Sequence, residues 1–248
     1  MAARPYTKAP PPIAAPVASW TGCYIGGGGG YGMFQRENVT YLTTTVPRTI
    51  LTDQWDFGGR GWFGTVQGGC DYQFSAGLPW NLVIGAFADY DFADITSDPT
   101  NPWSGLGGQV KLSSQWAVGG RIGVTVTPNL LVYFSGGYTE AKSDQLNLFA
   151  KSINNIAFLP IGANAGIHVP GQTFNGWFIG AGTEYAMNFL PGLFWKTEYR
   201  FSEFDAVTTR TYFTATNAYT GVDEDVKKFV QTVRSSLVYR FNWGGSRY

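Results

Sequence analysis

Charged residues are scarce in this chain of 248 residues: Asp, Glu, Lys and Arg make up 14% of it, against about a quarter in a typical soluble protein. The 17 basic and 17 acidic residues cancel, so the sequence lacks the basic excess that a nucleic-acid partner requires. No apolar run approaches the roughly 18 residues of a membrane-spanning helix. The composition therefore argues against a nucleic-acid-binding protein and against a helical membrane protein.

Histidine and cysteine, which supply many metal ligands and catalytic groups, are also rare. The single histidine, His168, lies in a predicted loop, with no serine at a spacing typical of a Ser–His enzyme. The two cysteines, Cys23 and Cys70, are too few for a structural zinc site. We therefore predict no catalytic, cofactor or metal site, and we do not expect an enzyme.

Glycine and aromatic residues are abundant, and alternation with a period of two is clearest between Trp177 and Phe201. Aromatic and apolar side chains alternate there with Gly and charged residues, on both sides of a turn at Pro191-Gly192. A period of two predicts strands whose successive side chains point to opposite faces. Because the aromatics are numerous and the charged face carries both signs, we predict that the apolar face contacts lipid and the charged face points inward.

Similar alternation predicts eight strands. They are expected at residues 20–32, 61–74, 80–92, 112–126, 129–138, 177–188, 194–201 and 229–241. Long predicted loops, at 33–60, 93–111, 139–173 and 202–228, alternate with short turns at 75–79, 127–129 and 189–193. This is typical of an all-β, eight-stranded antiparallel up-and-down transmembrane β-barrel, with four long extracellular loops and short periplasmic turns.

The first residues differ from the rest of the chain. Residues 1–19 are rich in proline, which favours extended, solvated backbone and is excluded from the interior of a sheet. We interpret residues 1–19 as a periplasmic tail and residues 20–248 as the barrel domain. No apolar segment typical of a secretion signal follows Met1, so we expect the signal of an exported protein to have been removed.

The inward face of the predicted barrel carries a balanced set of charges, which we call the lumen charge network. Its members are Asp71, Asp89, Asp91, Arg121, Glu184, Lys196, Glu198, Arg200, Arg234 and Arg240. An eight-stranded barrel is just wide enough for side chains to fill it, and buried charges there must pair. We therefore predict a barrel closed by ion pairs. The alternative is that these ten charges lie on the surface of a soluble protein, which would force Trp62, Trp116, Trp177 and Trp195 into one core. Acid–base chemistry by Asp89 and Asp91 is a further alternative, and we favour salt bridging over it.

Cys23 and Cys70 fall at similar heights on the first two predicted strands. Directly opposed residues of an antiparallel pair come within disulfide range, and an oxidising envelope favours the bond. We predict a Cys23–Cys70 disulfide, with two buried free thiols as the alternative.

Four motifs together resemble a known family. They are WTGCYIGGGGGYG at 20–32, GGCDYQF at 68–74, GWFIGAGTEYAMN at 176–188 and LVYRFNWG at 237–244. These segments resemble the Gram-negative outer-membrane immunogenic-protein or "porin family" barrels, small relatives of the OmpA transmembrane domain. The resemblance implies an outer-membrane location, contact with lipid and lipopolysaccharide, and insertion by the barrel-assembly machinery. It also implies an aromatic insertion signal near the C-terminus, for which Phe241 and Tyr248 are the candidates.

A structural and surface-display role in the outer membrane is the leading functional hypothesis. A narrow channel for small solutes is the alternative, and a lipid-modifying enzyme or a soluble ligand-binding barrel comes third. The predicted loops are rich in aromatic residues, which suits a surface partner. The same residues suit loops that pack on one another or anchor at the lipid interface, an interpretation that we favour.

Overall fold

The structure, a computed structural model, describes residues 18–77 and 79–241. Most of the predicted tail at 1–19 and the candidate insertion signal Tyr248 lie outside the described residues. Within the described residues, every regular element is a β-strand. No helix in this part of the chain is long and apolar enough to cross a membrane.

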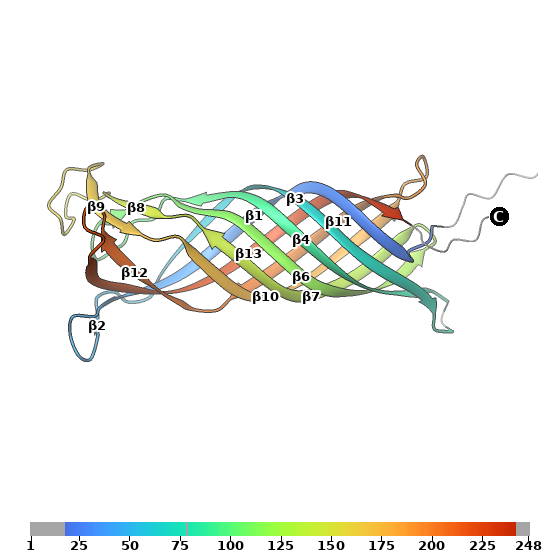
Figure 1. The fold of residues 1–248 in the computed structure, drawn as a ribbon, viewed down its shortest axis with the longest axis horizontal. Helices are drawn as coiled ribbons and strands as arrows, with labels where there is room; N and C mark the ends of the chain where they lie inside the picture. Colours follow the sequence, from blue (N-terminus) through green and yellow to red (C-terminus); the bar gives the residue numbers. More distant parts are fainter. Residues whose placement is uncertain (1–17, 78, 242–248) are drawn as a thin grey trace, which may run out of the picture.

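Eight long strands in the described part of the chain close into a barrel (Figure 1). They are β1 (Gly22–Leu42), β3 (Trp55–Ser75), β4 (Asn81–Ser97), β6 (Val110–Thr127), β7 (Leu130–Ser143), β10 (Gln172–Ala186), β11 (Leu193–Phe204) and β13 (Tyr219–Phe241). Each strand pairs antiparallel with its neighbours in this order, and β13 pairs with β1 to complete the ring. The predicted all-β, eight-stranded up-and-down barrel is confirmed.

Side chains alternate between the lumen and the exterior along the barrel strands. On β10, Phe178 and Glu184 are buried, whereas Trp177 and Ile179, on either side of Phe178, are 45% and 57% exposed and Tyr185, next to Glu184, is 40% exposed. The other barrel strands expose residues of the same kind, among them Trp62, Val66, Ile122, Phe134, Tyr199, Val233 and Leu237. The predicted assignment of faces is therefore correct, with the apolar residues outside.

Aromatic side chains gather near both ends of the apolar band. Trp62 and Tyr72 both point outward from β3. The tilted stretch of strand between them rises roughly 25 Å along the barrel axis. Tyr138 and Trp177 are exposed near one end of the band, and Tyr185, Trp195 and Tyr239 are exposed near the other. Belts at this separation match the two interfaces of a membrane with an apolar band of about 25 Å.

The strands continue well beyond this band, so the predicted loop bounds are wrong. A membrane-spanning strand needs about 9–11 residues. In contrast, β1 and β3 have 21 residues each and β13 has 23. Residues 33–42, 55–60 and 219–228, predicted as loop, are strand. Outside the membrane neither face contacts lipid, so the apolar and polar alternation that reveals a strand in the sequence is lost.

Five short strands in the described residues lie at the extracellular end, which is at the left of Figure 1. They are β2 (Thr49–Ile50), β5 (Leu106–Gly107), β8 (Leu146–Ala150), β9 (Asn164–Val169) and β12 (Val207–Phe213). Strand β12 pairs with β13 where β11 has ended, and β9, β8 and β5 follow in that order. We call β5, β8, β9 and β12, together with residues 33–42 and 219–228, the extracellular rim. It extends the barrel wall above the membrane.

Candidate functional site

All ten residues of the lumen charge network point into the barrel, and none is more than 7% exposed. They divide into two groups along the barrel axis. The periplasmic cluster consists of Asp71, Arg121, Glu184 and Arg240, and the central cluster of Asp89, Asp91, Lys196, Glu198, Arg200 and Arg234. Each cluster holds as many acids as bases, so each is neutral when all its members are ionised.

The periplasmic cluster is a closed square of alternating charge. Its residues come from β3, β6, β10 and β13, which are every second strand around the ring. Arg121 donates to both oxygens of Asp71, at 2.8 and 2.5 Å, and to Glu184 at 2.8 Å. Arg240 donates to Asp71 at 2.6 Å and to Glu184 at 2.7 Å. Each guanidinium thus joins the same two carboxylates, and the four side chains bridge the lumen in one layer.

Two tyrosines and two glycines hold this square in place. The Arg121 guanidinium lies 4.9 Å from the ring centroids of both Tyr24 and Tyr133. Such contacts stabilise a cation that has left water. A Cβ atom at Gly85 would collide with the Asp71 carboxylate, and one at Gly182 would collide with the Tyr133 hydroxyl. These inward glycines therefore provide the space that the network occupies.

The central cluster spans the full width of the lumen. Arg200 on β11 donates to both oxygens of Asp89, at 3.0 and 2.7 Å, and β4, which carries Asp89, lies on the opposite side of the ring. Arg200 also donates to Glu198 at 3.0 and 2.8 Å. Lys196 lies 3.5 Å from the other oxygen of Glu198. Bidentate pairing of this kind fixes both the position and the orientation of the guanidinium.

Further contacts of Arg234 and Lys196 complete the central cluster. Arg234 donates to Asp91 at 2.9 Å and lies 3.2 Å from Asp89. Lys196 donates to the side-chain oxygen of Gln67 at 2.6 Å. The structure therefore brings every predicted member of the network into an ion pair with another predicted member.

Among the described residues, three further charged residues face the lumen and lie outside the predicted network. Arg36 and Lys228 face inward from β1 and β13, directly opposite each other in the register, and Glu224 lies 3.6 Å from Arg36. They were missed because residues 33–60 and 202–228 were predicted to be loops. Even-numbered residues of β1 point inward from Tyr24 onward, and continuing that count would have placed Arg36 in the lumen.

The predicted disulfide is present: Cys23 is bonded to Cys70. The two residues are directly opposite in the β1–β3 register, and Cys70 lies on the outer face. We expect a maleimide reagent to label no cysteine in the unfolded protein unless a reductant is added first, and to label both after reduction. Mass spectrometry of the intact chain counts the labels. Two labels without reductant would contradict the bond, and a Cys23→Ser variant with one label is the control.

His168 lies outside the lumen. It is part of β9 in the extracellular rim, where its ring stacks on Tyr212 with centroids 5.9 Å apart. Its Nδ1 lies 3.5 Å from the Thr214 hydroxyl, and no serine hydrogen-bonds to it among the described residues. Residues 18–77 and 79–241 contain no group of three His, Cys, Asp or Glu side chains placed to hold a metal ion.

A closed ring of antiparallel strands with an apolar exterior and an ionic interior defines an outer-membrane β-barrel protein. No protein-family model matches the chain. It is, however, 31% identical over 236 residues to the 31 kDa outer-membrane immunogenic protein of Brucella melitensis, and equally to that of Brucella suis. The matches cover 93% of this chain and 88% of each relative. The chain belongs to the family of these outer-membrane immunogenic proteins, and its outer-membrane location follows.

Solved structures of other outer-membrane proteins are similar at lower levels of identity. The protease OmpT of Escherichia coli is 12% identical, with a TM-score of 0.45 over 90% of this chain and 98% of that one. OprG of Pseudomonas aeruginosa is 11% identical, with a TM-score of 0.44 over 90% of this chain and 99% of that one.

Proposed function

We propose that the protein is a closed barrel with a structural and surface-display role in the outer membrane. The Arg200–Asp89 pair, which crosses the lumen between opposite strands, is the observation that carries this proposal. The periplasmic cluster forms a second crossing. An ion moving along the axis would have to break both sets of buried pairs, each of which has strong short contacts in a low-dielectric interior.

Apolar side chains support the same interpretation, because they fill the lumen on either side of the charges. One cluster, including Trp20, Phe87, Leu131 and Phe194, surrounds the periplasmic cluster. Another, including Phe34, Phe63, Phe174 and Phe204, lies toward the extracellular side. Water and ions are poorly accommodated between such layers.

The extracellular rim would perform the display. Val46 and Phe158 are 100% and 94% exposed, and both lie in connections at this end. Exposed apolar residues on connections that this wall carries suit contact with a surface partner. We further propose that lipid and lipopolysaccharide surround the barrel and that the barrel-assembly machinery inserts it. Phe241, which points outward at the end of β13, is the candidate insertion signal among the described residues.

A narrow channel is the second candidate function. The hydroxyls of Thr65, Thr232 and Ser236 are buried on the inner wall and have no hydrogen-bond partner among the described residues. Hydroxyls of this kind favour water beside the charge network. These unpartnered hydroxyls along β3 and β13 are therefore the observation that favours conduction.

Conductance measurement separates the two candidates. We expect the folded protein, reconstituted into a planar lipid bilayer, to show no unitary currents, because buried ion pairs cross the lumen. Protease protection of the same preparation verifies insertion. A variant that opens both crossings, with Glu198→Ala/Arg200→Ala in the central cluster and Asp71→Ala/Arg121→Ala in the periplasmic cluster, is expected to conduct and serves as the matched control. Steady unitary currents from the unmodified protein would instead support the channel.

A further inference from the structure

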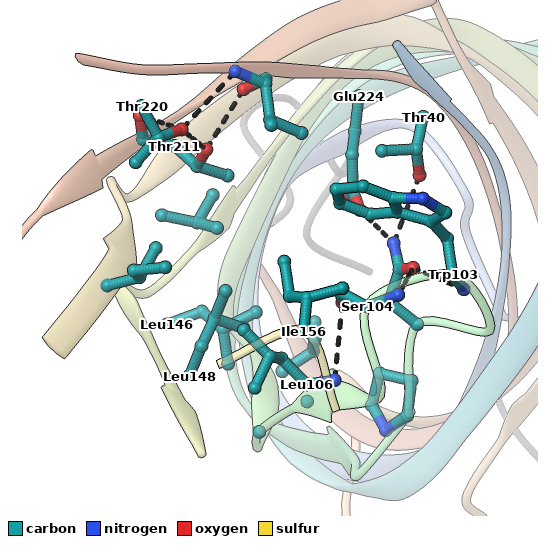
Figure 2. Close-up of a pocket in the computed structure, with 18 of the residues that line it drawn as sticks. Thr40, Trp103, Ser104, Leu106, Leu146, Leu148, Ile156, Thr211, Thr220 and Glu224 are labelled. Atoms are coloured by element: carbon teal, nitrogen blue, oxygen red, sulfur yellow. Dashed lines mark hydrogen bonds between the residues drawn. The ribbon is translucent and has the colours of Figure 1, made fainter. Parts of the chain in front are cut away.

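A cavity of about 390 Å³ lies in the extracellular rim, above the lumen charge network (Figure 2). Its volume falls within the range of about 300–1,000 Å³ that is typical of small-molecule sites. Much of its wall is apolar and comes from Leu106, Leu146, Leu148, Ile156, Ile167 and Phe213. Leu106 is only 2% exposed whereas Phe213 is 46% exposed, so the wall runs from the interior to solvent.

The β4–β6 connection fixes one side of this cavity. The Asn101 amide nitrogen donates to the Thr40 hydroxyl and to the Glu224 carboxylate, both at 3.0 Å. The Asn101 side-chain oxygen accepts from the backbone of Trp103 and Ser104, at 3.0 and 3.1 Å. These bonds hold the connection against β1 and β13. In Figure 2 the leucines gather on one side of the cavity and Thr40, Trp103 and Glu224 on another.

The inner end of the cavity carries an incompletely paired guanidinium. Arg36 lines the cavity and is only 5% exposed. Its Nε donates to Asn38 at 2.7 Å. Its terminal nitrogens have a 3.6 Å contact to Glu224 and no hydrogen bond among the described residues. A buried guanidinium with free donors is a strong binding group for a carboxylate, which matches its planar fork.

A second basic residue, Lys228, lies beside Arg36 but does not line the cavity. Lys228 is fully buried directly opposite Arg36, and its Nζ donates to the Ser143 hydroxyl at 2.7 Å. It forms no salt bridge with any described residue, and its nearest aromatic contact is Phe174, whose ring centroid lies 4.0 Å away. Among the described residues that line the cavity, Arg36 is therefore the basic group and Glu224 the acidic one.

We propose that this cavity binds a small anionic amphiphile, of which a medium-length alkyl carboxylate is the simplest form. Its alkyl body contacts Leu106, Leu146 and Leu148, and its carboxylate accepts hydrogen bonds from the terminal nitrogens of Arg36. The apolar wall provides affinity, and the free terminal donors of Arg36 select the anionic head group. This binding activity goes beyond the structural role proposed above and does not depend on whether the barrel conducts.

Isothermal titration calorimetry with octanoate tests this inference. The protein is embedded in lipid nanodiscs, and the heats measured with empty nanodiscs are subtracted. Octan-1-ol and octylammonium, which share the chain length but differ in head-group charge, are titrated in parallel. We expect saturable octanoate binding, at least about tenfold weaker binding of octan-1-ol, and none of octylammonium.

Two variants locate the site. Arg36→Gln is expected to weaken octanoate binding by about tenfold and to leave octan-1-ol binding unchanged, because it removes the charge and keeps a polar group. Leu148→Glu, at a partly exposed wall position, is expected to abolish binding of both octanoate and octan-1-ol. If Arg36→Gln does not fold, Leu148→Glu alone shows whether the cavity is the binding site. Ile50→Glu on β2, outside the cavity, is the matched control and should bind octanoate normally.

Three results would overturn the inference. One is an affinity for octanoate that is no higher than the affinity for octan-1-ol. Another is no saturable octanoate binding by folded, inserted protein. The third is octanoate binding that survives in Leu148→Glu. None of these results bears on the bilayer conductance of the protein, so the structural role is tested separately.

Discussion

Replacing Arg200 by methionine is expected to lower the free energy of unfolding of the barrel by about 3–5 kcal/mol. The change leaves Asp89 without its bidentate partner and removes two of the hydrogen bonds to Glu198. Both carboxylates stay buried and keep, among the described residues, only the longer ion-pair contacts to Arg234 and Lys196, at 3.2 and 3.5 Å. A buried charge that has lost its main partner is far more costly than a lost surface contact. Urea unfolding of the protein in phospholipid vesicles, followed by tryptophan fluorescence, measures the change.

Lys111→Met is the matched control for this prediction, because it breaks an ion pair of a different kind. Lys111 pairs with Asp94 at 2.9 Å, but their side chains are 38% and 74% exposed. Exposed pairs typically contribute less than about 1 kcal/mol. If Arg200→Met cost no more than Lys111→Met, the central cluster would not stabilise the barrel, and the closed-lumen proposal would lose its main support.

A lysine at position 122 is expected to cost about 2–4 kcal/mol, because it would place an ammonium near the middle of the membrane. Ile122 points outward and is 56% exposed. Its direct cross-strand neighbours are Ile84 and Phe134, which are also exposed on the outer face. The same vesicle-based unfolding measurement gives the size of the effect.

Ile50→Lys provides the comparison for Ile122→Lys. Ile50 is 62% exposed, but it lies on β2 in the extracellular end. A lysine there should change stability by no more than about 0.5 kcal/mol, as for an ordinary surface substitution. Equal effects at the two positions would mean that the outer face near Ile122 does not contact lipid.

The membrane-spanning part of the fold could be predicted from the sequence because the bilayer imposes a strict contrast between its two faces. Trp195, Thr197 and Tyr199 alternate with Lys196, Glu198 and Arg200, and no other arrangement separates them as well. The extracellular part could not be predicted in the same way. Residues 33–42 place Phe34 inside and Met33 outside, so neither face has a uniform polarity.

The membership of the charge network could be predicted from the sequence, but its pairing could not. Alternation shows which residues face inward, and all ten of the predicted residues do. Which acid meets which base depends on the closure of the ring and on the height of each residue along the axis. Asp89 and Arg200 are separated by 111 residues, and only the opposition of β4 and β11 brings them together.

The division of the lumen into two neutral clusters limits how the interior of this barrel can change over evolutionary time. A substitution that removes Arg121 leaves Asp71 and Glu184 facing a single arginine, whereas the central cluster is unaffected. Compensation must therefore arise within the same cluster, often on a strand far away in the sequence. The pairing therefore predicts that the ten charged positions vary among relatives as two units. Either unit could be replaced by another neutral set of side chains while the other unit stays unchanged.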